Sequence, residues 1–460
     1  MTSPSRLGGN VGAFQYLALG FGTMIGSAWV ILLGDWLSWA GPGGAVLGFL
    51  GGAIFVAAIG ACYAELTSRL PEAGSEFIYA HRIYGRSLAF TVGWFLVLYL
   101  ISVTVFEALA LAWIVEILVP GWKSTTLYSL FGAPISAETL LVGIAGTAII
   151  FVLNLRGSQV AIISHSILTY SFLAVVLCIL SVLLLYGHTT NLLPLFASTD
   201  DKPWWLGSGS IFAFCAYGLN GFQAIPQAIE ERSGTISLRT IGLVIIGSIA
   251  AAALFYCAAV IAASAVMPWR SLVSASLPMV AAASALPHGR AIATVLLIAT
   301  AASLLKAWNG VFMMCARLLV AMARTGYVPE ALARLHPRFR SPATALLLIG
   351  LLNVGGIFFG KGAIEPITDM CAMVLTLTYL MCCVTVLKIR ATGASTEFKV
   401  PGGTTIVLLG AAGAALMASV AFISPFWQQP GVPLEWRLLG GWGAIGLFVW
   451  FFGVRGDTAT

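Results

Sequence analysis

The sequence predicts an all-α polytopic membrane protein, and its composition and hydropathy both favour this class. Of the 460 residues, 59% are hydrophobic and 9% are charged, whereas a soluble domain carries roughly 25% charged residues. Apolar runs close to the ~20 residues that a helix needs to cross a bilayer recur along the chain. The length of the chain therefore reflects the number of transmembrane helices and not the number of soluble domains.

Hydropathy places twelve transmembrane helices on the chain. The segments between them are too short to form a separate soluble domain. The expected spans are residues 14–40, 43–69, 88–118, 137–155, 160–186, 208–230, 240–264, 291–323, 343–360, 364–387, 404–424 and 437–453.

The positive charges predict which side of the membrane each loop faces. With the N-terminus in the cytoplasm, Lys and Arg concentrate in the loops on that side, as cytoplasmic loops usually show. We therefore expect both termini inside and a multi-pass protein of the cytoplasmic (inner) membrane. The outward-facing segments then hold only Lys123, Lys202, Arg270, Arg290, Lys361 and Arg437.

The cysteines predict no metal site and no cofactor. All of them fall within apolar runs without metal-ligand spacing, so we expect small buried hydrophobes. The net charge of +6 follows the membrane topology, so no nucleic-acid partner is expected. The cysteines are Cys62, Cys178, Cys215, Cys257, Cys315, Cys371, Cys382 and Cys383.

The first span is interrupted by poor helix formers. The stretch Gly20–Trp29 reads GFGTMIGSAW. Glycine costs about 1 kcal/mol relative to alanine in a helix, and Ser and Thr offer the backbone competing hydrogen bonds. In lipid, an opened backbone is tolerated only where it is buried in protein or lines a cavity, and there its N–H groups can hold an anion. The alternative is a small-residue surface for close helix packing.

The sixth span carries a matching interruption. Its run Tyr217–Pro226, YGLNGFQAIP, places two glycines and a proline in mid-segment, and proline removes a helix hydrogen bond. Two interrupted helices five spans apart are typical of a transporter that is built from inverted repeats and holds its substrate at the midplane. We expect one repeat in residues 14–186 and the other in residues 208–387.

Short motifs follow one another in a fixed order from residue 14 to about residue 345. They are Gly22–Ser27 (GTMIGS) in the first span, Glu65–Gly74 (ELTSRLPEAG) and Tyr84-Gly85 after the second, Asn154–Gly157 (NLRG) after the fourth, Gly221–Gln227 and Glu230-Glu231 in the sixth, and Trp308-Asn309, Arg317 to Pro329 and His336 to Pro342 around the eighth. Together they resemble the amino acid–polyamine–organocation permease family.

The resemblance implies a LeuT-like bundle, in which five plus five helices form two inverted repeats. Residues 404–453 then add two peripheral helices, and residues 1–13 and 454–460 form cytoplasmic termini. It also implies secondary active transport of an amino acid or related amine by alternating access, as a symporter or antiporter, and not an enzyme.

By position, the resemblance assigns a substrate site to the two interrupted helices. The Ser27 hydroxyl and the Ala28 N–H are expected to bind a substrate carboxylate. The carbonyls of Met24, Tyr217 and Asn220 are expected to take its ammonium, and Tyr217 is also the expected aromatic lid. The complete set is Met24, Gly26, Ser27, Ala28, Tyr217, Asn220, Gly221, Gln223 and Trp308.

Three of these residues bear on specificity. Trp308 is the expected wall of the side-chain pocket. Ala28 stands where the family usually has glycine, which narrows the approach to the anion site. Gln223 stands where many members carry Asp or Glu, which removes a charge used elsewhere in coupling or selectivity.

Two charges are placed in mid-membrane, where each costs several kcal/mol. Lys306 lies in the middle of the eighth span and Glu107 in the middle of the third. Either they form a structural salt bridge, or one of them titrates or contacts substrate, because a buried lysine can release a proton near neutral pH. Lys306 can also stand in for the sodium ion that related sodium-coupled carriers bind near the eighth helix. His165, early in the fifth span, is expected to be a core histidine.

Four further charges lie near expected cytoplasmic ends. For these charges, snorkelling to the interface or pairing between helices is expected. They are Glu65, Arg69, Arg317 and Arg324.

Other function classes have less support in the sequence. It contains no HExxH, G-x-S-x-G or phosphate-binding loop of an enzyme and no potassium-type filter of a channel. A sensor on the same scaffold remains an alternative function, as does a carrier or exchanger of a non-carboxylate amine such as a polyamine or amino alcohol.

Coupling of transport to protons, without sodium, is the expected mode. Residues 119–136 contain no cysteine, so no disulfide-linked glycoprotein subunit is expected.

Overall fold

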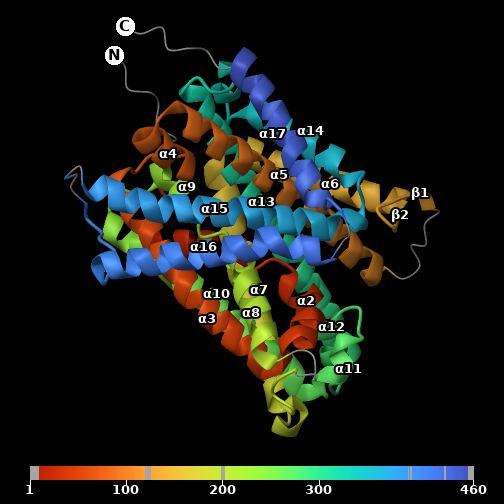
Figure 1. Ribbon diagram of the computed structural model, residues 1–460. Coiled ribbons are helices and arrows are strands. Elements are labelled where there is room, and N and C mark those ends of the chain that lie inside the picture. The colour runs from red at the N-terminus through yellow and green to blue at the C-terminus, as the bar shows by residue number, and fades with distance from the viewer. Residues whose placement is uncertain are drawn as a thin grey trace, which may run out of the picture.

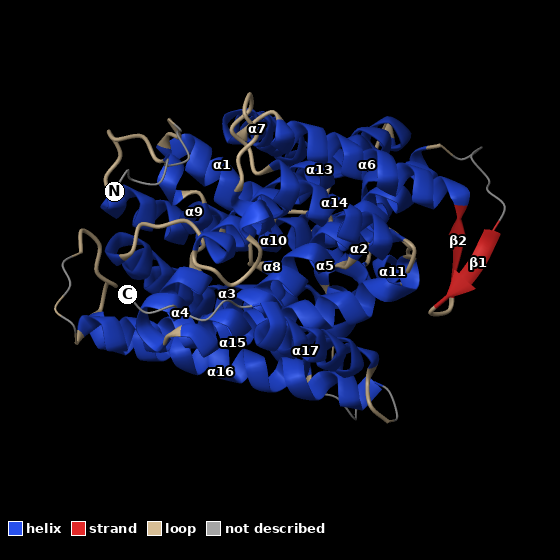
Figure 2. Ribbon diagram, turned by 90° about the horizontal axis from the view of Figure 1, so that it is seen from above, coloured by secondary structure: helices blue, strands red, loops and turns tan. Residues whose placement is uncertain are grey.

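The structure is a computed structural model that describes residues 10–119, 126–197, 203–391, 393, 396–428 and 431–453. It is a bundle of long helices with one β-hairpin at its edge (Figures 1 and 2). Within these ranges, nine helical segments have the length and apolar character needed to cross a membrane. They are Ala13–Ile31, Leu33–Arg69, Arg86–Leu118, Ala137–Leu155, Ser158–Leu185, Leu238–Val266, Gly289–Arg324, Lys361–Arg390 and Gly403–Ile423.

Helices also occupy the remaining predicted positions, although they are shorter or less apolar. These are α8 (Trp204–Gly218) with α9 (Ala224–Gln227) in the sixth predicted span, α14 (Ala343–Ile357) and α17 (Leu434–Gly453). The long helices carry the labels α5 (Arg86–Leu118), α6 (Ala137–Leu155), α7 (Ser158–Leu185), α10 (Leu238–Val266), α13 (Gly289–Arg324), α15 (Ile364–Arg390) and α16 (Gly403–Gln428). Most of α5 is buried, whereas α6 and α7 expose much of their length, so α5 lies near the centre of the bundle.

The first predicted span is broken where its glycines lie. Helix α1 (Ala13–Met24) ends at Ile25, which is extended (φ −94°, ψ 91°), and α2 (Ala28–Ile31) starts after Ser27. Helix α3 (Leu33–Arg69) continues from there with a sharp turn at Gly41, whose φ is +69°. This turn separates the first predicted span from the second without a loop, because glycine adopts a positive φ at little cost.

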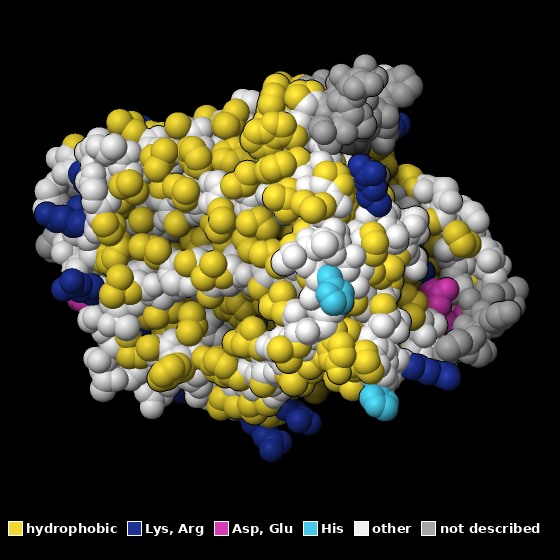
Figure 3. Space-filling view, turned by 90° about the horizontal axis from the view of Figure 1, so that it is seen from below, with side chains coloured by type: hydrophobic (Ala, Val, Ile, Leu, Met, Phe, Trp, Pro, Cys, Tyr) yellow, Lys and Arg dark blue, Asp and Glu magenta, His cyan; other side chains and the backbone are white. Residues whose placement is uncertain are grey.

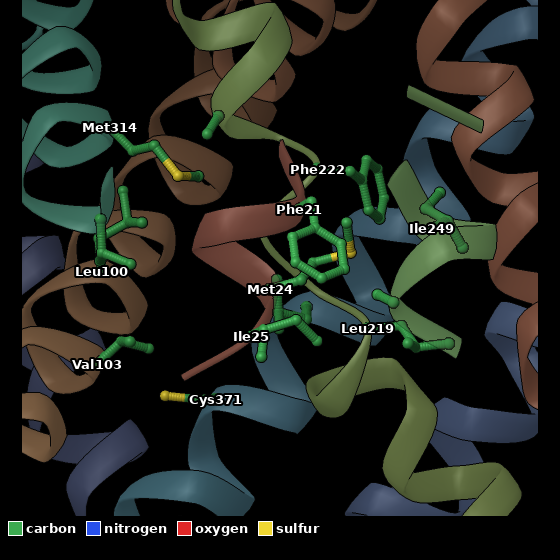
Figure 4. Close-up of a cluster of buried hydrophobic side chains, with 14 of the residues drawn as sticks. Phe21, Met24, Ile25, Leu100, Val103, Leu219, Phe222, Ile249, Met314 and Cys371 are labelled. Atoms are coloured by element: carbon green, nitrogen blue, oxygen red, sulfur yellow. The ribbon is translucent and has the colours of Figure 1, made fainter. Parts of the chain in front are cut away.

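The sixth predicted span is broken in the same way, and the two breaks touch. Helix α8 (Trp204–Gly218) and α9 (Ala224–Gln227) are separated by a non-helical stretch, and the 3-10 turn Ile229–Glu231 follows. Gly221 in that stretch has φ +117°, and a Cβ atom placed on it would lie 2.7 Å from the backbone nitrogen of Met24. Figure 4 shows Phe21, Met24 and Ile25 from the first break beside Leu219 and Phe222 from the second.

The β-hairpin corrects the all-α prediction. Strands β1 (Thr126–Leu130) and β2 (Ala133–Ser136) pair antiparallel and project from one end of the bundle (Figure 2). Phe131 and Gly132 between them both have positive φ, as a two-residue type I′ turn requires. The strands are too short for hydropathy to reveal, and the Tyr128 hydroxyl ties them to the carbonyl of Phe358 at 2.8 Å. The short helices α4 (Glu76–Tyr84), α11 (Trp269–Val273) and α12 (Pro278–Ser284) were likewise not predicted.

The outer surface matches a membrane environment. Apolar side chains cover most of the face in Figure 3, and the Lys and Arg side chains lie towards its margins. Large exposed apolar residues such as Leu185, Leu254 and Phe451 lie on different helices. A surface of this kind is unfavourable in water and favourable against lipid acyl chains.

The contact between the two breaks yields a stability prediction. Gly221→Ala should lower the free energy of unfolding by about 2 kcal/mol or more, because the new methyl group collides with the Met24 backbone and the positive φ is strained. Thermal unfolding in detergent measures this loss. Gly247→Ala in α10 is the matched control, since its Cβ enters open space on a helix and should be neutral or slightly stabilising. Equal effects of the two substitutions would contradict the contact.

Candidate transport site at the two broken helices

The break in the first helix leaves carbonyl groups that α13 satisfies. The Lys306 ammonium donates to the carbonyl of Gly22 at 2.8 Å and also to the carbonyl of Ile25. One turn earlier on α13, the Ser303 hydroxyl lies 2.8 Å from the carbonyl of Ile25 and 3.0 Å from that of Gly26. The opened backbone is therefore hydrogen-bonded by side chains from a helix some 280 residues later in the chain.

Lys306 is fully buried, and no carboxylate within the described part of the chain forms an ion pair with it. Besides the two carbonyls, its ammonium lies 4.6 Å from the centre of the Phe172 ring on α7, a cation–π contact. No salt bridge joins Lys306 and Glu107 among the described residues, so the first of the two roles expected for this pair is wrong.

Glu107 faces the same break from α5. Its Oε1 atom would lie 3.2 Å from a Cβ placed on Gly26, and the residue is 4% exposed. Its Oε2 atom has no hydrogen-bond partner within the described part of the chain. A buried carboxylate oxygen without a donor is costly, so this atom is available to a donor from a bound molecule or to a proton.

Ser27 is another buried polar group at the first break, where Thr23 also has a hydroxyl without a partner among the described residues. Its residue is 1% exposed, and its hydroxyl bonds to none of the residues that the structure describes. The flanking Gly26 and Ala28 keep partial exposure, so this part of the break borders accessible space. The Met24 carbonyl already accepts a hydrogen bond from the Tyr256 hydroxyl at 3.3 Å.

In the sixth predicted span, some residues stabilise the break through hydrogen bonds and others are partly exposed. Gln223 accepts from the Gly221 N–H at 2.7 Å and donates to the Tyr379 hydroxyl at 3.0 Å, so both ends of its amide stabilise the break. Asn220 accepts from the Tyr99 hydroxyl at 2.8 Å, and its amide donates to the carbonyl of Tyr217. Tyr217 and Asn220 are only half-buried, which leaves their expected substrate contacts as predictions.

Trp308 is fully buried and its ring packs against α6. A Cβ on Gly146 of α6 would be 2.6 Å from this ring. Residues two apart on a helix point to different sides, so Trp308 and Lys306 cannot both face α1. In this conformation Trp308 packs between α13 and α6, and its expected role as a wall of the side-chain pocket stays a prediction.

Sequence reasoning missed four residues that complete the site. Ser303 could have been found, because it lies three residues before Lys306 and shares its helix face. The three tyrosines lie in ordinary apolar helical runs, and no local pattern marks them. They are Tyr99, Tyr256 and Tyr379.

His165 lies in the core beneath the first break. Its Nε2 atom lies 3.1 Å from the carbonyl of Ala18, and the hydroxyl of Thr169 approaches the same carbonyl at 3.4 Å. The residue is fully buried, and its Nδ1 atom has no partner among the described residues. The expected core position is therefore found, with one ring nitrogen unsatisfied.

Ion pairs close one end of the bundle, as expected for the charges near helix ends. Arg317 on α13 binds Glu231 after α9 through two carboxylate contacts at 2.7 and 2.9 Å, and both side chains are buried. Glu65 binds Arg390 on α15 at 2.7 Å and Arg69 at 2.9 Å. Arg324 and Glu230 form a weaker contact at 3.5 Å.

A polar network beside these ion pairs ties the α3–α4 connection to α9. Gln227 accepts from the Gly74 N–H at 3.1 Å and donates to Glu76 at 3.3 Å, and the Tyr63 hydroxyl donates to Glu76 at 3.0 Å. Burial raises the pKa of the Glu76 carboxyl above its ordinary value, because the charged form loses its hydration. Together with the Arg317–Glu231 pair, this network joins α3, α4, α9 and α13 at that end of the bundle.

Comparison with known proteins identifies the family. A family model described as amino acid permease matches residues 11–445. The chain belongs to the amino acid permease family. It is 25% identical over 451 residues to the methylthioribose transporter of Bacillus subtilis, covering 95% of this chain and 92% of that protein.

Two further relatives, also from Bacillus subtilis, match over most of their length. A branched-chain amino acid permease is 23% identical over 455 residues, covering 94% of this permease and 91% of the relative. A glutamate/serine transporter is 25% identical over 459 residues, with coverage of 95% and 81%. The family consists of membrane transporters and not of enzymes, so this permease is a multi-pass membrane transporter.

The buried ion pair of the permease gives the second prediction. Glu231→Gln should destabilise the protein by about 3–5 kcal/mol, because it leaves the Arg317 charge buried without its partner. The exposed pair of Lys361 and Glu116 is the control, and Glu116→Gln should cost at most about 1 kcal/mol. Chemical unfolding in micelles compares the two variants. Similar losses in both would mean that the Arg317 pair is effectively solvated.

Proposed function

We propose that this permease is a proton-coupled, sodium-independent carrier of an amino acid or a related amine in the cytoplasmic membrane. It works by alternating access around the two broken helices. The observation that carries the proposal is the Lys306 ammonium held by the carbonyls of the first break, with the Glu107 carboxylate at the same break.

The proposed architecture has twelve spans in two inverted halves. Residues 14–186 and 208–387 are the halves, residues 404–453 are peripheral, and the termini at 1–13 and 454–460 are cytoplasmic. Support comes from the first helix of each half, because both are broken and their breaks touch at Gly221 and Met24. The ion pairs at one end of the bundle join segments that positive charges assign to the cytoplasm. Residues 1–9 and 454–460 lie outside the described part of the structure.

Sodium independence follows from the ammonium in the break. Unwound carbonyls of a broken membrane helix are the groups that coordinate sodium in coupled carriers. Here Lys306 and Ser303 already donate to the carbonyls of Gly22, Ile25 and Gly26. A sodium ion would have to displace a charge of the same sign from an anhydrous site, so the lysine takes its place.

Proton coupling follows from the charges that meet at the break. A substrate carboxylate near Ser27 and Gly26 would approach the carboxylate of Glu107. Two carboxylates in one buried site cannot both be ionised without a large cost, so one proton enters with the substrate. Lys306 is buried without an ion-pair partner, and it can offset the remaining negative charge or release its own proton.

An alternative substrate class has one specific observation in its favour. The free Oε2 atom of Glu107 suits an ammonium or hydroxyl donor, which a polyamine or amino alcohol supplies without a carboxylate. The relatives' names range from methylthioribose to branched-chain amino acids and glutamate/serine, so the family admits different substrates. Saturable uptake and counterflow of a labelled solute would distinguish a carrier from a channel or a sensor on the same scaffold.

Ser27→Ala tests which substrate class binds. A thermal-shift screen of amino acids, polyamines and amino alcohols first supplies a ligand. For a carboxylate ligand, the substitution should weaken binding roughly tenfold or more, because a hydrogen bond to a charged group is worth about 1.5–3 kcal/mol. Calorimetric titration measures the change, and Ser181→Ala on the outer face of α7 should have no effect. Unchanged affinity in a folded Ser27→Ala protein would reject the carboxylate contact and favour the amine class.

Lys306→Met tests the coupling mode. The substitution keeps the aliphatic stem but removes the charge, so pH-dependent uptake should be lost while ligand binding stays measurable. Glu107→Gln should shift the pH optimum, because it removes the carboxylate that shares the break with the lysine. Initial uptake into proteoliposomes is measured against pH, with and without sodium.

The control for charge removal is Lys388→Met. Lys388 lies over the Tyr84 ring at the end of α15, away from the breaks. The pH dependence of uptake by Lys388→Met should therefore match that of the wild type. A sodium requirement in the wild type, or a normal pH profile in Lys306→Met, would reject the coupling role of Lys306.

A further inference from the structure

The last helix of the chain is attached to the bundle through a pair of tryptophans. Helix α17 lies across α5 and α15 (Figure 1). The indole N–H of Trp94 donates to the carbonyl of Trp442, and the indole of Trp442 donates to the carbonyl of Trp94, both at 2.9 Å. The two rings stack at 4.7 Å, and a Cβ on Gly446 would lie 2.5 Å from the Trp94 ring nitrogen. At this point α17 and α5 are in direct contact.

Between its aromatic contacts, among them Trp94 with Trp442 and Phe90 with Trp450, α17 leaves a space against its neighbours. A crevice of about 860 Å³ separates it from α5, α15 and the end of α16, and its lining carries no charged side chain. The crevice is open towards the outer surface of the bundle, so an apolar group from the surrounding bilayer can enter it.

Small residues on one face of α17 leave the room that the crevice occupies. Small residues on membrane helices usually let two backbones approach closely. Gly440 and Ala444 line the crevice instead, and a Cβ on Gly440 meets no atom within 4 Å. The opposite wall holds large apolar side chains, among them Phe90, Leu377 and Met381. The glycine face thus provides room for a long apolar group between α17 and the core.

We propose that the crevice binds the acyl chains of a bilayer phospholipid, which fills the gap between α17 and the transport core. The apolar lining matches hydrocarbon, and burial of each CH₂ group is favourable. One end supplies polar groups for a phosphate, because the hydroxyl-bearing residues Ser87 and Thr91 line it. The proposal is independent of substrate and coupling mode, because the crevice lies apart from the breaks.

The test uses the full-length permease in detergent, stripped of lipid, and phosphatidylglycerol as the added probe. Native mass spectrometry should find a retained lipid, and thermal unfolding should show a concentration-dependent rise in Tm, as binding to the folded state alone requires. Dioleoylglycerol has the chains but no phosphate, and it should be retained less. Equal retention of the two lipids would overturn the placement of the phosphate at the Ser87 end.

Gly440→Leu places a side chain in the crevice and should abolish both lipid retention and the rise in Tm. Gly441→Leu is the matched control, because its Cβ also meets open space but the residue does not line the crevice. It should behave as the wild type. Wild-type lipid retention in Gly440→Leu, or equal loss in both variants, would overturn the site.

A second measurement does not depend on the folding of a variant. A phosphatidylglycerol with a diazirine in its acyl chain should label wild-type peptides of α17 and α15 that face the crevice. Labelling confined to other helices would overturn the proposal.

Discussion

The ammonium of Lys306 in the break of the first helix is the interaction on which the arrangement of the core depends. An open helix in lipid leaves carbonyl groups that water cannot reach, and each unsatisfied group costs several kcal/mol. Lys306 and Ser303 satisfy them from α13 and so fix that helix against α1. His165 and Thr169 bond to Ala18 and fix α7 on the same side. Three helices thus meet at one opened stretch of backbone.

The charges of the protein fall into two groups that differ in how they are neutralised. Arg317, Glu231 and Glu65 lie at one end of the bundle, and each of these three has an opposite charge in direct contact. Lys306 and Glu107 lie at the first break, and their side chains approach the same backbone without pairing with each other. The paired charges hold helices together at that end, while Lys306 and Glu107 are held at the break by contacts other than an ion pair with each other.

The sequence predicted those parts of the site that depend on local composition. Glycine, serine and threonine weaken a helix wherever they cluster, so both breaks could be located from Gly20–Trp29 and Tyr217–Pro226. Hydropathy alone singled out Lys306 and Glu107, because a charge in a long apolar run is costly in any fold. The same signals placed the long helices within a few residues of their observed ends.

The sequence could not show in which direction a given side chain points within the folded bundle. A residue next to a site residue in the chain can face another way, because Trp308 lies two positions after Lys306 and packs against Gly146. Tyr99 and Tyr379 join the site from helices whose relative rotation is set only by packing. The turn at Gly41 and the short hairpin around Phe131 depend on positive φ angles, which hydropathy does not register.

The distance along the chain between Gly22 and Lys306 has a consequence for biogenesis. The two residues are 284 positions apart, and at about 5–20 residues per second the ribosome needs tens of seconds to make the segment between them. During that interval the first helix has left the ribosome while the side chains that satisfy its carbonyls do not yet exist. The nascent chain must therefore keep this helix either fully wound or close to the polar interior of the insertion machinery until the later helices arrive. The break can open only when the second half of the protein is in place.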